Sequence, residues 1–387
     1  MYGPERSDPL NRYAYILLFL SFILLFIRDL VNRNKLKIDT LFALLFVTFN
    51  VLLMIMSLLR EDLIHALVFP VSQLMVLFVI YSLFNILQKN NLDINYTISV
   101  TFIVFGTVSF IFAIIAYAQG GLSLGPLSIY NPDEIRLTGW FGSPNYTSSV
   151  FGISLISILY LKTRIKNKHL VLNILLVLMV VGLLLTGSKG AWLAMLIALL
   201  FYYILRFNLQ ILKFKNIAYG GLVVTFLLLL AIYGLKILGF EEEQILFEIA
   251  RIDSLEGQLD PNNPGGRGRV FYWTTAIDTF RNSDVHIMLF GQGTGGLTNV
   301  FGRSAHSGFL TTLINRGGIL LGILLLILFY FYKVALQNRY LRYYSIYPIT
   351  MMTYLVFKNI TNNDFPSNGF TGLVFITVLL LVFFKRR

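Results

Sequence analysis

Arginine and lysine side chains stand at a few glycine-rich turns of this sequence, where they could bind phosphate. One turn, Pro264-Gly-Gly-Arg267-Gly-Arg269, leads directly into a predicted helix over 269–281. Helix N-termini present free N–H groups, and the planar guanidinium group matches phosphate oxygens in pairs. Two arginines at such an end are unfavourable for the helix unless an anion binds there. The turn therefore predicts a phosphate site, with a solvated surface turn as the alternative.

Two further segments carry residues suited to the same chemistry. Thr186-Gly-Ser188-Lys189-Gly-Ala-Trp192 is a short turn between two very apolar stretches, and it places a lysine at the membrane edge. A snorkelling lysine at a helix end is the alternative. His306 follows Arg303 at the point where a long loop returns to an apolar stretch, which suits a general base, a hydrogen-bond donor or a phosphate ligand. A structural histidine is the alternative interpretation there.

Several other classes of site are excluded by the residues. The chain has no cysteine, no Asp-x-Asp pair and no histidine cluster at metal-ligand spacing, so neither thiol chemistry nor a metal site is expected. The spacing of the glycines in 291–296 resembles a dinucleotide-binding motif, but no strand–helix–strand unit surrounds them. We interpret that run as a backbone turn that approaches a ligand. Span interiors hold no carboxylates, whereas Arg316 and Lys358 lie at or inside span boundaries and are expected to face a cavity or a partner.

The elements that must position these residues are membrane helices. Hydrophobic residues make up 56% and charged residues 13% of the 387, against about 25% charged in soluble domains. Apolar stretches recur, so the sequence predicts one all-α polytopic membrane domain over 1–387, with about 11 (10–12) transmembrane helices. The predicted spans are 13–31, 40–59, 63–87, 97–117, 146–161, 170–186, 191–205, 217–239, 308–332, 345–360 and 370–384.

The net charge of +12 reflects orientation in the membrane rather than nucleic-acid binding. Lysines and arginines concentrate in the short loops of one side, together with the C-terminal Lys385-Arg386-Arg387, and this side is predicted to be cytoplasmic. Two segments on the opposite side are too long to be simple connectors: a first extracytoplasmic loop over 118–145 and a large loop or cap over 240–306. The cap is expected to be partly helical.

Two amphipathic helices are predicted within the cap. Apolar residues recur at helical spacing over 244–257, and this helix could lie on the bilayer surface. The second helix, over 269–281, has Val270, Trp273, Ile277 and Phe280 on one side.

The runs TGSKGAW, RVFYW, FGQGTGG and AHSGFL, in this order, resemble the O-antigen ligase/polymerase superfamily. The segment GWFGSPNYTSS also resembles a Pro-Asn element of that family, and the resemblance extends from about 139 to 320. It implies an all-helical fold related to lipid-dependent glycosyltransferases of the GT-C type. It also implies transfer of glycan from undecaprenyl diphosphate at the periplasmic or outer face of the cytoplasmic (inner) membrane, without a metal or other cofactor.

The resemblance also assigns residues. Arg269 matches the arginine of an Arg-x3-Trp element and His306 the histidine at the loop's return, and these two are the expected catalytic residues. Lys189 stands where ligases commonly have arginine, so a Wzy-type polymerase is favoured over a WaaL-type ligase. Diphosphate contacts are expected from Arg267, Arg269, Lys189, Arg136 and Arg303.

The expected reaction joins lipid-linked repeat units into a surface polysaccharide, either O-antigen or capsule. Undecaprenyl-diphosphate-linked oligosaccharide would be both donor and acceptor, with the lipid bilayer, a flippase and a chain-length regulator as partners. Two alternatives stay open: a ligase that transfers glycan to lipid A-core, and a polysaccharide or lipid transporter without catalysis.

Overall fold

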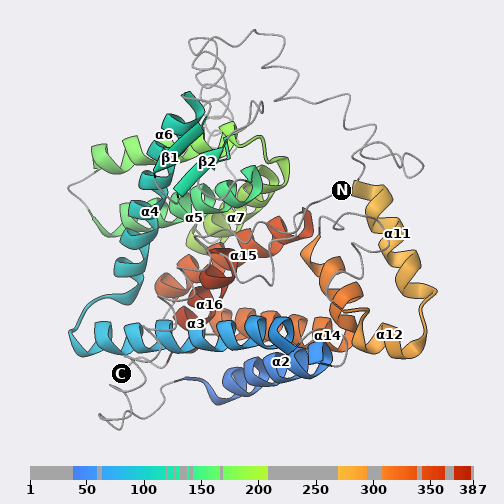
Figure 1. The fold of residues 1–387 in the computed structure, drawn as a ribbon. Helices are drawn as coiled ribbons and strands as arrows, with labels where there is room; N and C mark the ends of the chain where they lie inside the picture. The colour runs from blue at the N-terminus through green and yellow to red at the C-terminus, as the bar shows by residue number, and fades with distance from the viewer. Residues whose placement is uncertain are drawn as a thin grey trace.

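The computed structural model is predominantly helical (Figure 1). It describes residues 38–58, 63–118, 121–124, 127–130, 137–138, 143–165, 169–207, 269–293, 307–337, 342–361 and 370–384. The helices are α2 (Thr40–Leu58), α3 (Leu63–Lys89), α4 (Ile94–Ala118), α5 (Pro144–Arg164), α6 (His169–Leu185), α7 (Lys189–Phe207), α11 (Arg269–Arg281), α12 (Val285–Phe290), α14 (Gly308–Gln337), α15 (Arg342–Thr361) and α16 (Phe370–Phe383). A small antiparallel sheet joins β1 (Gly121–Leu124) to β2 (Leu127–Tyr130).

The predicted spans agree with these helices. Nine of the eleven coincide with α2–α7 and α14–α16 among the described residues, whereas 13–31 and 217–239 lie outside them. In the part of the chain that the structure describes, 4 helices are long and apolar enough to cross a membrane, and these are segments of α3, α4, α7 and α14. The helical membrane architecture is thus confirmed, with the β1–β2 hairpin added inside the first long loop.

Contacts between helix ends fit the alternating directions that the span order requires. The backbone N–H of Asp39 donates to the carbonyl of Phe383 at 3.0 Å, so the start of α2 meets the end of α16. Tyr330 of α14 donates its hydroxyl to the Asp39 carboxylate at 3.0 Å. At the end of α5, Arg164 lies 3.8 Å from the Asp93 carboxylate, which precedes α4. Each contact joins helix ends that lie on the same membrane face when successive spans cross the membrane in alternating directions.

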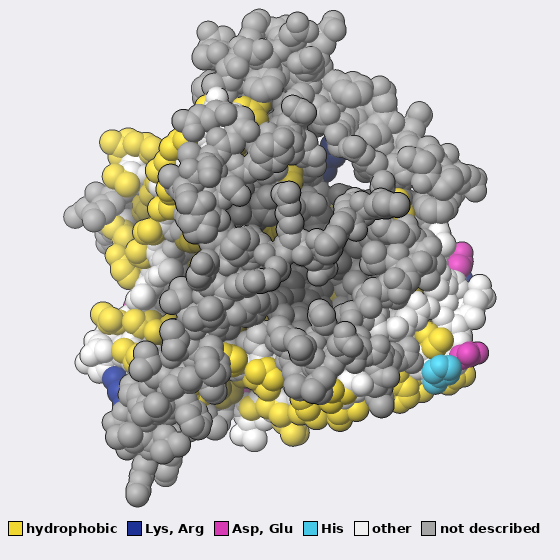
Figure 2. Space-filling view, in the orientation of Figure 1, with side chains coloured by type: hydrophobic (Ala, Val, Ile, Leu, Met, Phe, Trp, Pro, Cys, Tyr) yellow, Lys and Arg dark blue, Asp and Glu magenta, His cyan; other side chains and the backbone are white. Residues whose placement is uncertain are grey.

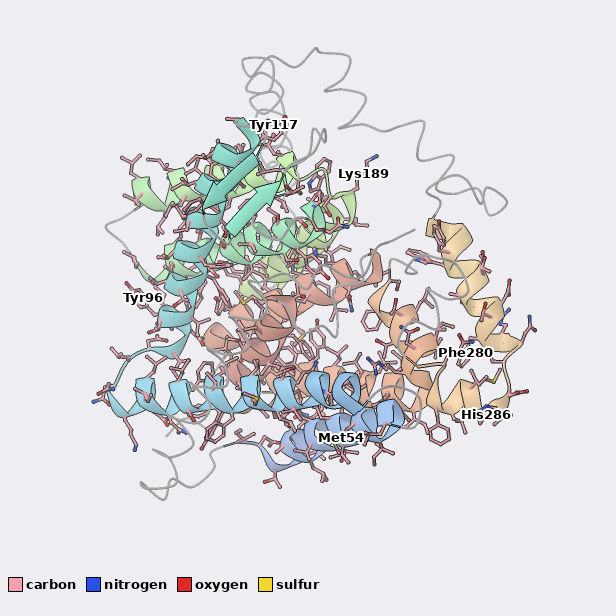
Figure 3. All side chains as sticks on the ribbon, in the orientation of Figure 1. Met54, Tyr96, Tyr117, Lys189, Phe280 and His286 are labelled. Atoms are coloured by element: carbon pink, nitrogen blue, oxygen red, sulfur yellow. The ribbon has the colours of Figure 1, made fainter. Side chains whose placement is uncertain are left out.

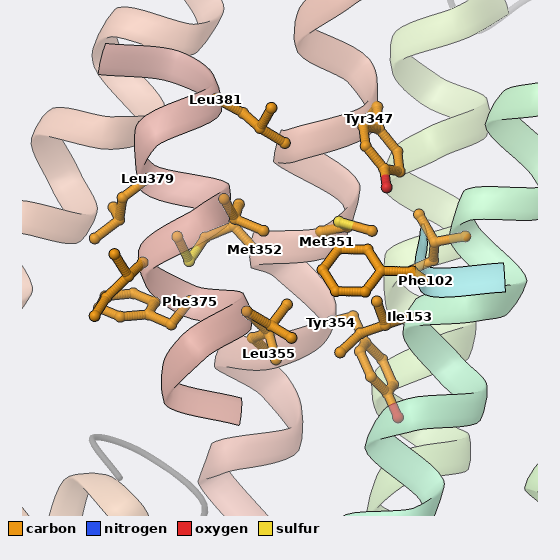
Figure 4. Close-up of a cluster of buried hydrophobic side chains, with 14 of the residues drawn as sticks. Phe102, Ile153, Tyr347, Met351, Met352, Tyr354, Leu355, Phe375, Leu379 and Leu381 are labelled. Atoms are coloured by element: carbon orange, nitrogen blue, oxygen red, sulfur yellow. The ribbon is translucent and has the colours of Figure 1, made fainter. Parts of the chain in front are cut away.

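One part of the extended buried core is formed by side chains of α4, α5, α15 and α16 (Figure 4). In that view Met352 and Leu355 of α15 lie toward Phe375 of α16, while Phe102 and Ile153 lie on the other side of α15. These side chains are almost entirely buried. Close packing of these side chains, rather than their removal from water, stabilises the arrangement of helices in a bilayer, and this arrangement fixes the loops and helix ends described below.

The outward surface of the described helices is apolar. Large hydrophobic side chains are exposed along α2, α4, α6 and α7, including Leu44, Val104, Leu170 and Leu193. Figure 2 shows such side chains over the lower and left parts of the molecule, while acidic and histidine side chains appear on the right. An apolar exterior of this extent is expected for helices that face lipid.

Candidate functional site

The turn that carries Lys189 is tightly held. Gly187 takes a positive φ of 59°, and the Thr186 side chain is fully buried and donates to the carbonyl of Leu183 at 2.7 Å. The indole N–H of Trp192 donates to the same carbonyl at 2.9 Å. α7 then begins at Lys189 itself. The lysine is therefore fixed at a helix N-terminus by bonds on both sides of it in the sequence.

The start of α5 packs against this turn. Pro144 opens the helix, and the Ser188 hydroxyl donates to the Asn145 side-chain carbonyl at 2.9 Å. Ser188 and the nearby hydroxyl residues Thr147, Ser148, Ser149 and Thr186 are all buried. The hydroxyls of Ser148, Ser149 and Thr186 donate to carbonyls three or four residues earlier in the chain, so their burial is satisfied locally. The Asn145–Ser188 bond brings the Pro-Asn element and the Lys189 turn together.

Residues 137–138 close the same end of the molecule. The backbone N–H of Leu137 donates to the carbonyl of Leu185 at 2.9 Å, and the Thr147 hydroxyl donates to the carbonyl of Thr138. Both residues are buried. The chain at 137–138 therefore lies between the start of α5 and the end of α6. Arg136 directly precedes this segment and lies outside the described residues.

The second pair of helix starts belongs to α11, which lies in the cap, and α14, which begins where the chain returns from the cap. Ala276 of α11 and Ile314 of α14 form a small buried cluster, against which Phe280 and Leu310 pack. Near this cluster α11 and α14 run in the same direction (Figure 1). α12 follows the end of α11 and meets α14 at Gly317, which lies beyond Ile314 in the chain. The end of α11 is therefore on the side of the cluster toward Gly317. Arg269 and Ser307 each lie seven residues before the contact, about two helical turns. The backbones of Arg269 and Ser307 are therefore at one level.

His306 directly precedes Ser307, which is buried and caps α14 through the bond from the Leu310 N–H at 3.5 Å. His306, Arg267 and Arg303 lie outside the described residues, and of Arg269 the structure describes the backbone. The pairing of Arg269 with His306 therefore stays a prediction.

The described part of the glycine turn, 291–293, packs on α14. The N–H groups of Gln292 and Gly293 donate to the carbonyls of Ile314 and Asn315 at 2.8 and 3.0 Å. A Cβ on Gly291 would meet the backbone of Asn315. Glycine is needed there because backbone packs on backbone at the kink of α14.

The predicted helix over 269–281 is confirmed as α11. Tyr272 and Ala276 are its buried residues, whereas Ile277 is exposed and Trp273 and Phe280 are half-buried. The small Ala276 makes the contact with α14, with Phe280 packed beside it. Hydrophobic periodicity does not reveal which apolar side chains of a helix have a partner.

Lys189 lies at the same edge of the molecule as the end of α4 that carries Tyr117, opposite Tyr96 at the start of that helix (Figure 3). The upper end of α11 in Figure 1, which begins at Arg269, lies toward the same edge. Asn145 and Ser188 were not among the predicted site residues. The Pro-Asn element contained the signal, but their pairing joins positions 43 residues apart.

We expect the Asn145–Ser188 bond to position Lys189. For the glycan transfer that the sequence resemblance implies, Asn145→Ala and Ser188→Ala should each lower the rate about fivefold, and the double variant should be no slower, since one hydrogen bond contributes about 0.5–1.5 kcal/mol. Initial rates with purified protein measure this. Asn173→Ala is the matched control, because it removes the 2.7 Å bond from Lys162 near the other end of α5. Additive losses in the double variant would contradict the coupling.

Comparison with protein families finds a match over part of this arrangement. Residues 174–327, from α6 to α14, match a family described as O-antigen ligase. The matched region contains the Lys189 turn, α11, α12 and the kinked helix α14. The resemblance to the O-antigen ligase/polymerase superfamily is thereby confirmed. Comparison with curated proteins finds none that matches the chain.

Proposed function

We propose that this chain, a multi-pass membrane protein related to O-antigen ligases through residues 174–327, polymerises lipid-linked oligosaccharide repeat units. The observation that carries the proposal is that two of the predicted phosphate-binding residues, Lys189 and Arg269, each begin a helix. Lys189 is held at the start of α7, and Arg269 begins α11 level with the start of α14. Such starts, with cationic side chains, suit a diphosphate.

In the proposed reaction a hydroxyl of the acceptor glycan attacks the anomeric carbon of the donor. The bond between that carbon and the diphosphate oxygen breaks, and its electron pair stays on the undecaprenyl diphosphate. Arg267, Arg269, Lys189, Arg136 and Arg303 stabilise the negative charge that develops on the leaving diphosphate. Because this charge grows in the transition state, fixed cations lower the barrier to reaction as well as binding the donor.

His306 has the second role in this proposal. Its imidazole accepts the proton of the attacking hydroxyl, or orients that hydroxyl by a hydrogen bond. The products are a longer glycan on one lipid and free undecaprenyl diphosphate. No step requires a metal or other cofactor, because the leaving group is already activated by its diphosphate and the charge is balanced by side chains.

Orientation follows from the distribution of cations in the sequence. The end that carries Lys189 faces the periplasm or exterior of the cytoplasmic membrane, where flipped lipid-linked glycans are found. A flippase that delivers the donor and a chain-length regulator are the proposed partners. Lys189, which replaces the arginine common in ligases, favours the polymerase, since lysine keeps the charge but lacks the planar fork.

Purified protein in nanodiscs with an undecaprenyl-diphosphate-linked repeat unit tests the proposal. We expect a ladder of longer lipid-linked glycans and release of undecaprenyl diphosphate, without added metal and in the presence of a chelator. Transfer that occurs with a lipid A-core acceptor alone would assign the chain to the ligases. Movement of the lipid across the bilayer without any new glycosidic bond would make it a transporter and overturn the proposal.

A further inference from the structure

The short helix α12 presents apolar side chains to the outside of the protein. Its sequence is VHIMLF, in which every residue except the histidine is apolar, yet none of its residues is buried. Val285 is 71% exposed, and Leu289 and Phe290 are 42% and 44% exposed. Val285 and Leu289 are four residues apart and therefore lie on one side of the helix, and Phe290 follows directly. We call these three side chains the α12 patch.

The preceding helix of the cap, α11, exposes a different kind of surface. Thr274, Asp278 and Arg281 are exposed there, together with the single apolar residue Ile277. The apolar exposure is therefore concentrated on α12 and is not a general property of the cap. Large apolar side chains that gather on a surface mark contact with another protein or with lipid.

The kink of α14 gives the level of α12 relative to the membrane. A Cβ on Gly317 would meet the carbonyl of Leu289, so α12 lies directly at the kink. From the kink α14 continues to Gln337, and at about 1.5 Å per residue this part is about 30 Å long, which is the thickness of bilayer hydrocarbon. Arg339 and Arg342 follow Gln337 on the side that the sequence predicts to be cytoplasmic. In this orientation the kink and α12 lie at the outer edge of the hydrocarbon.

The exposed surface of α14 leads to the same place. Leu325, Leu326 and Phe329 lie beyond the kink and are exposed, as expected for side chains that face lipid. Apolar side chains follow the lower edge of the molecule in Figure 2 toward its lower right, where Figure 3 places His286 of α12. The α12 patch thus continues a surface that faces lipid, which favours lipid over a protein partner as its occupant.

The charged side chains around the patch favour acyl chains over anionic head groups. Asp278, Arg281 and Asp284 are exposed there, next to the exposed His286. A surface that binds anionic head groups needs an excess of lysine and arginine, and this one has none. The attraction must therefore come from the apolar side chains, and it should be insensitive to salt.

We propose that α12 inserts the side chains of Val285, Leu289 and Phe290 among the acyl chains of the outer leaflet and so anchors the cap to the membrane. Removal of these side chains from water stabilises the inserted state, while Asp284 and His286 stay among the polar head groups. The inference rests on the membrane architecture and is independent of the proposed reaction. It places 285–290, which the sequence assigns to an extracytoplasmic cap, within the edge of the bilayer.

Single-cysteine variants labelled with a fluorophore test this proposal in vesicles of phosphatidylcholine and phosphatidylglycerol. The chain has no cysteine, so Val285→Cys, Leu289→Cys and Phe290→Cys each carry one label. The vesicles contain lipid with a nitroxide quencher either near the head-group end or near the methyl end of the acyl chain. We expect all three labels to be quenched more strongly by the first nitroxide than by the second, and only weakly by iodide in the water. High salt should leave this pattern unchanged.

Asp278→Cys and Phe329→Cys are the matched controls. The label at Asp278, an exposed acidic position of α11, should be quenched by iodide, and the label at Phe329 should be quenched best by the nitroxide near the methyl end. Strong quenching of the α12 labels by iodide overturns the inference, because it places the patch in water. Protection from iodide and from both nitroxides also overturns it, because a second copy of the chain would then cover the patch. All three positions are exposed, so the substitutions remove little packing, and any one of the variants that accumulates is sufficient for the test.

Discussion

Replacing Arg269 or His306 by alanine is expected to abolish the polymer while the protein still accumulates in the membrane. Loss of one electrostatic stabiliser of a transition state costs about 10²–10³ in rate, and loss of a general base costs about 10²–10⁴. Either loss would leave cells with single-repeat glycans. The measurement is the ladder of glycan lengths on a gel, with protein amount followed by an epitope tag.

The arrangement of α11 and α14 is the reason to expect both effects together. Arg269 and Ser307 each lie seven residues before the Ala276–Ile314 contact of two helices that run in the same direction. His306 is the neighbour of Ser307, and the proposal has the arginine and the histidine act on one substrate from these two helix starts. Under saturating donor, the Arg269→Ala protein should also show a lower kcat, because the cation acts on charge that develops during bond cleavage.

Two variants of the same elements serve as controls. Arg281→Ala removes an exposed arginine at the other end of α11, and His286→Ala removes an exposed histidine from α12 (Figure 3). Both should give normal ladders. Normal ladders from Arg269→Ala or from His306→Ala would instead mean that the helix starts do not hold the reacting groups.

The helices of this fold could be predicted from the sequence because each is a nearly continuous apolar run with its own ends. The predicted span 308–332, for example, begins where α14 begins. The kink inside that helix was not predictable in the same way. Gly317 has φ 81° and ψ 170°, and this geometry is set by α12, which arrives from a different part of the chain.

In the candidate site, too, some features could be predicted from the sequence, whereas others depend on tertiary contacts. Cations at glycine-rich turns are visible in the sequence, so Lys189 and Arg269 could be singled out by residue type and setting. The bond from Ser188 to Asn145 and the burial of Lys358 depend on tertiary contacts between α5, α7 and α15. No local pattern encodes which face of α15 meets α5, because α15 is apolar on most of its circumference.

Gly317→Ala is the substitution with the largest expected effect on stability. Gly317 and Gly291 take φ 81° with ψ 170° and φ 75° with ψ 178°, a backbone region that is essentially restricted to glycine. A Cβ on Gly317 would also meet the carbonyl of Leu289. The conformational strain and the steric conflict together should cost about 2–5 kcal/mol of folding free energy.

The loss should appear as a lower melting temperature in detergent and as reduced glycan transfer, because the contact between α12 and the kink of α14 fixes the direction of α11 and hence of Arg269. Gly322→Ala is the matched control: it lies in the same helix, and a Cβ there would meet nothing within 4 Å. Alanine at that position should be neutral or slightly stabilising, since it favours the helix more than glycine does. Equal melting temperatures for the two variants would show that the kink is not held by α12, and the common level of Arg269 and Ser307 would then lose its structural basis.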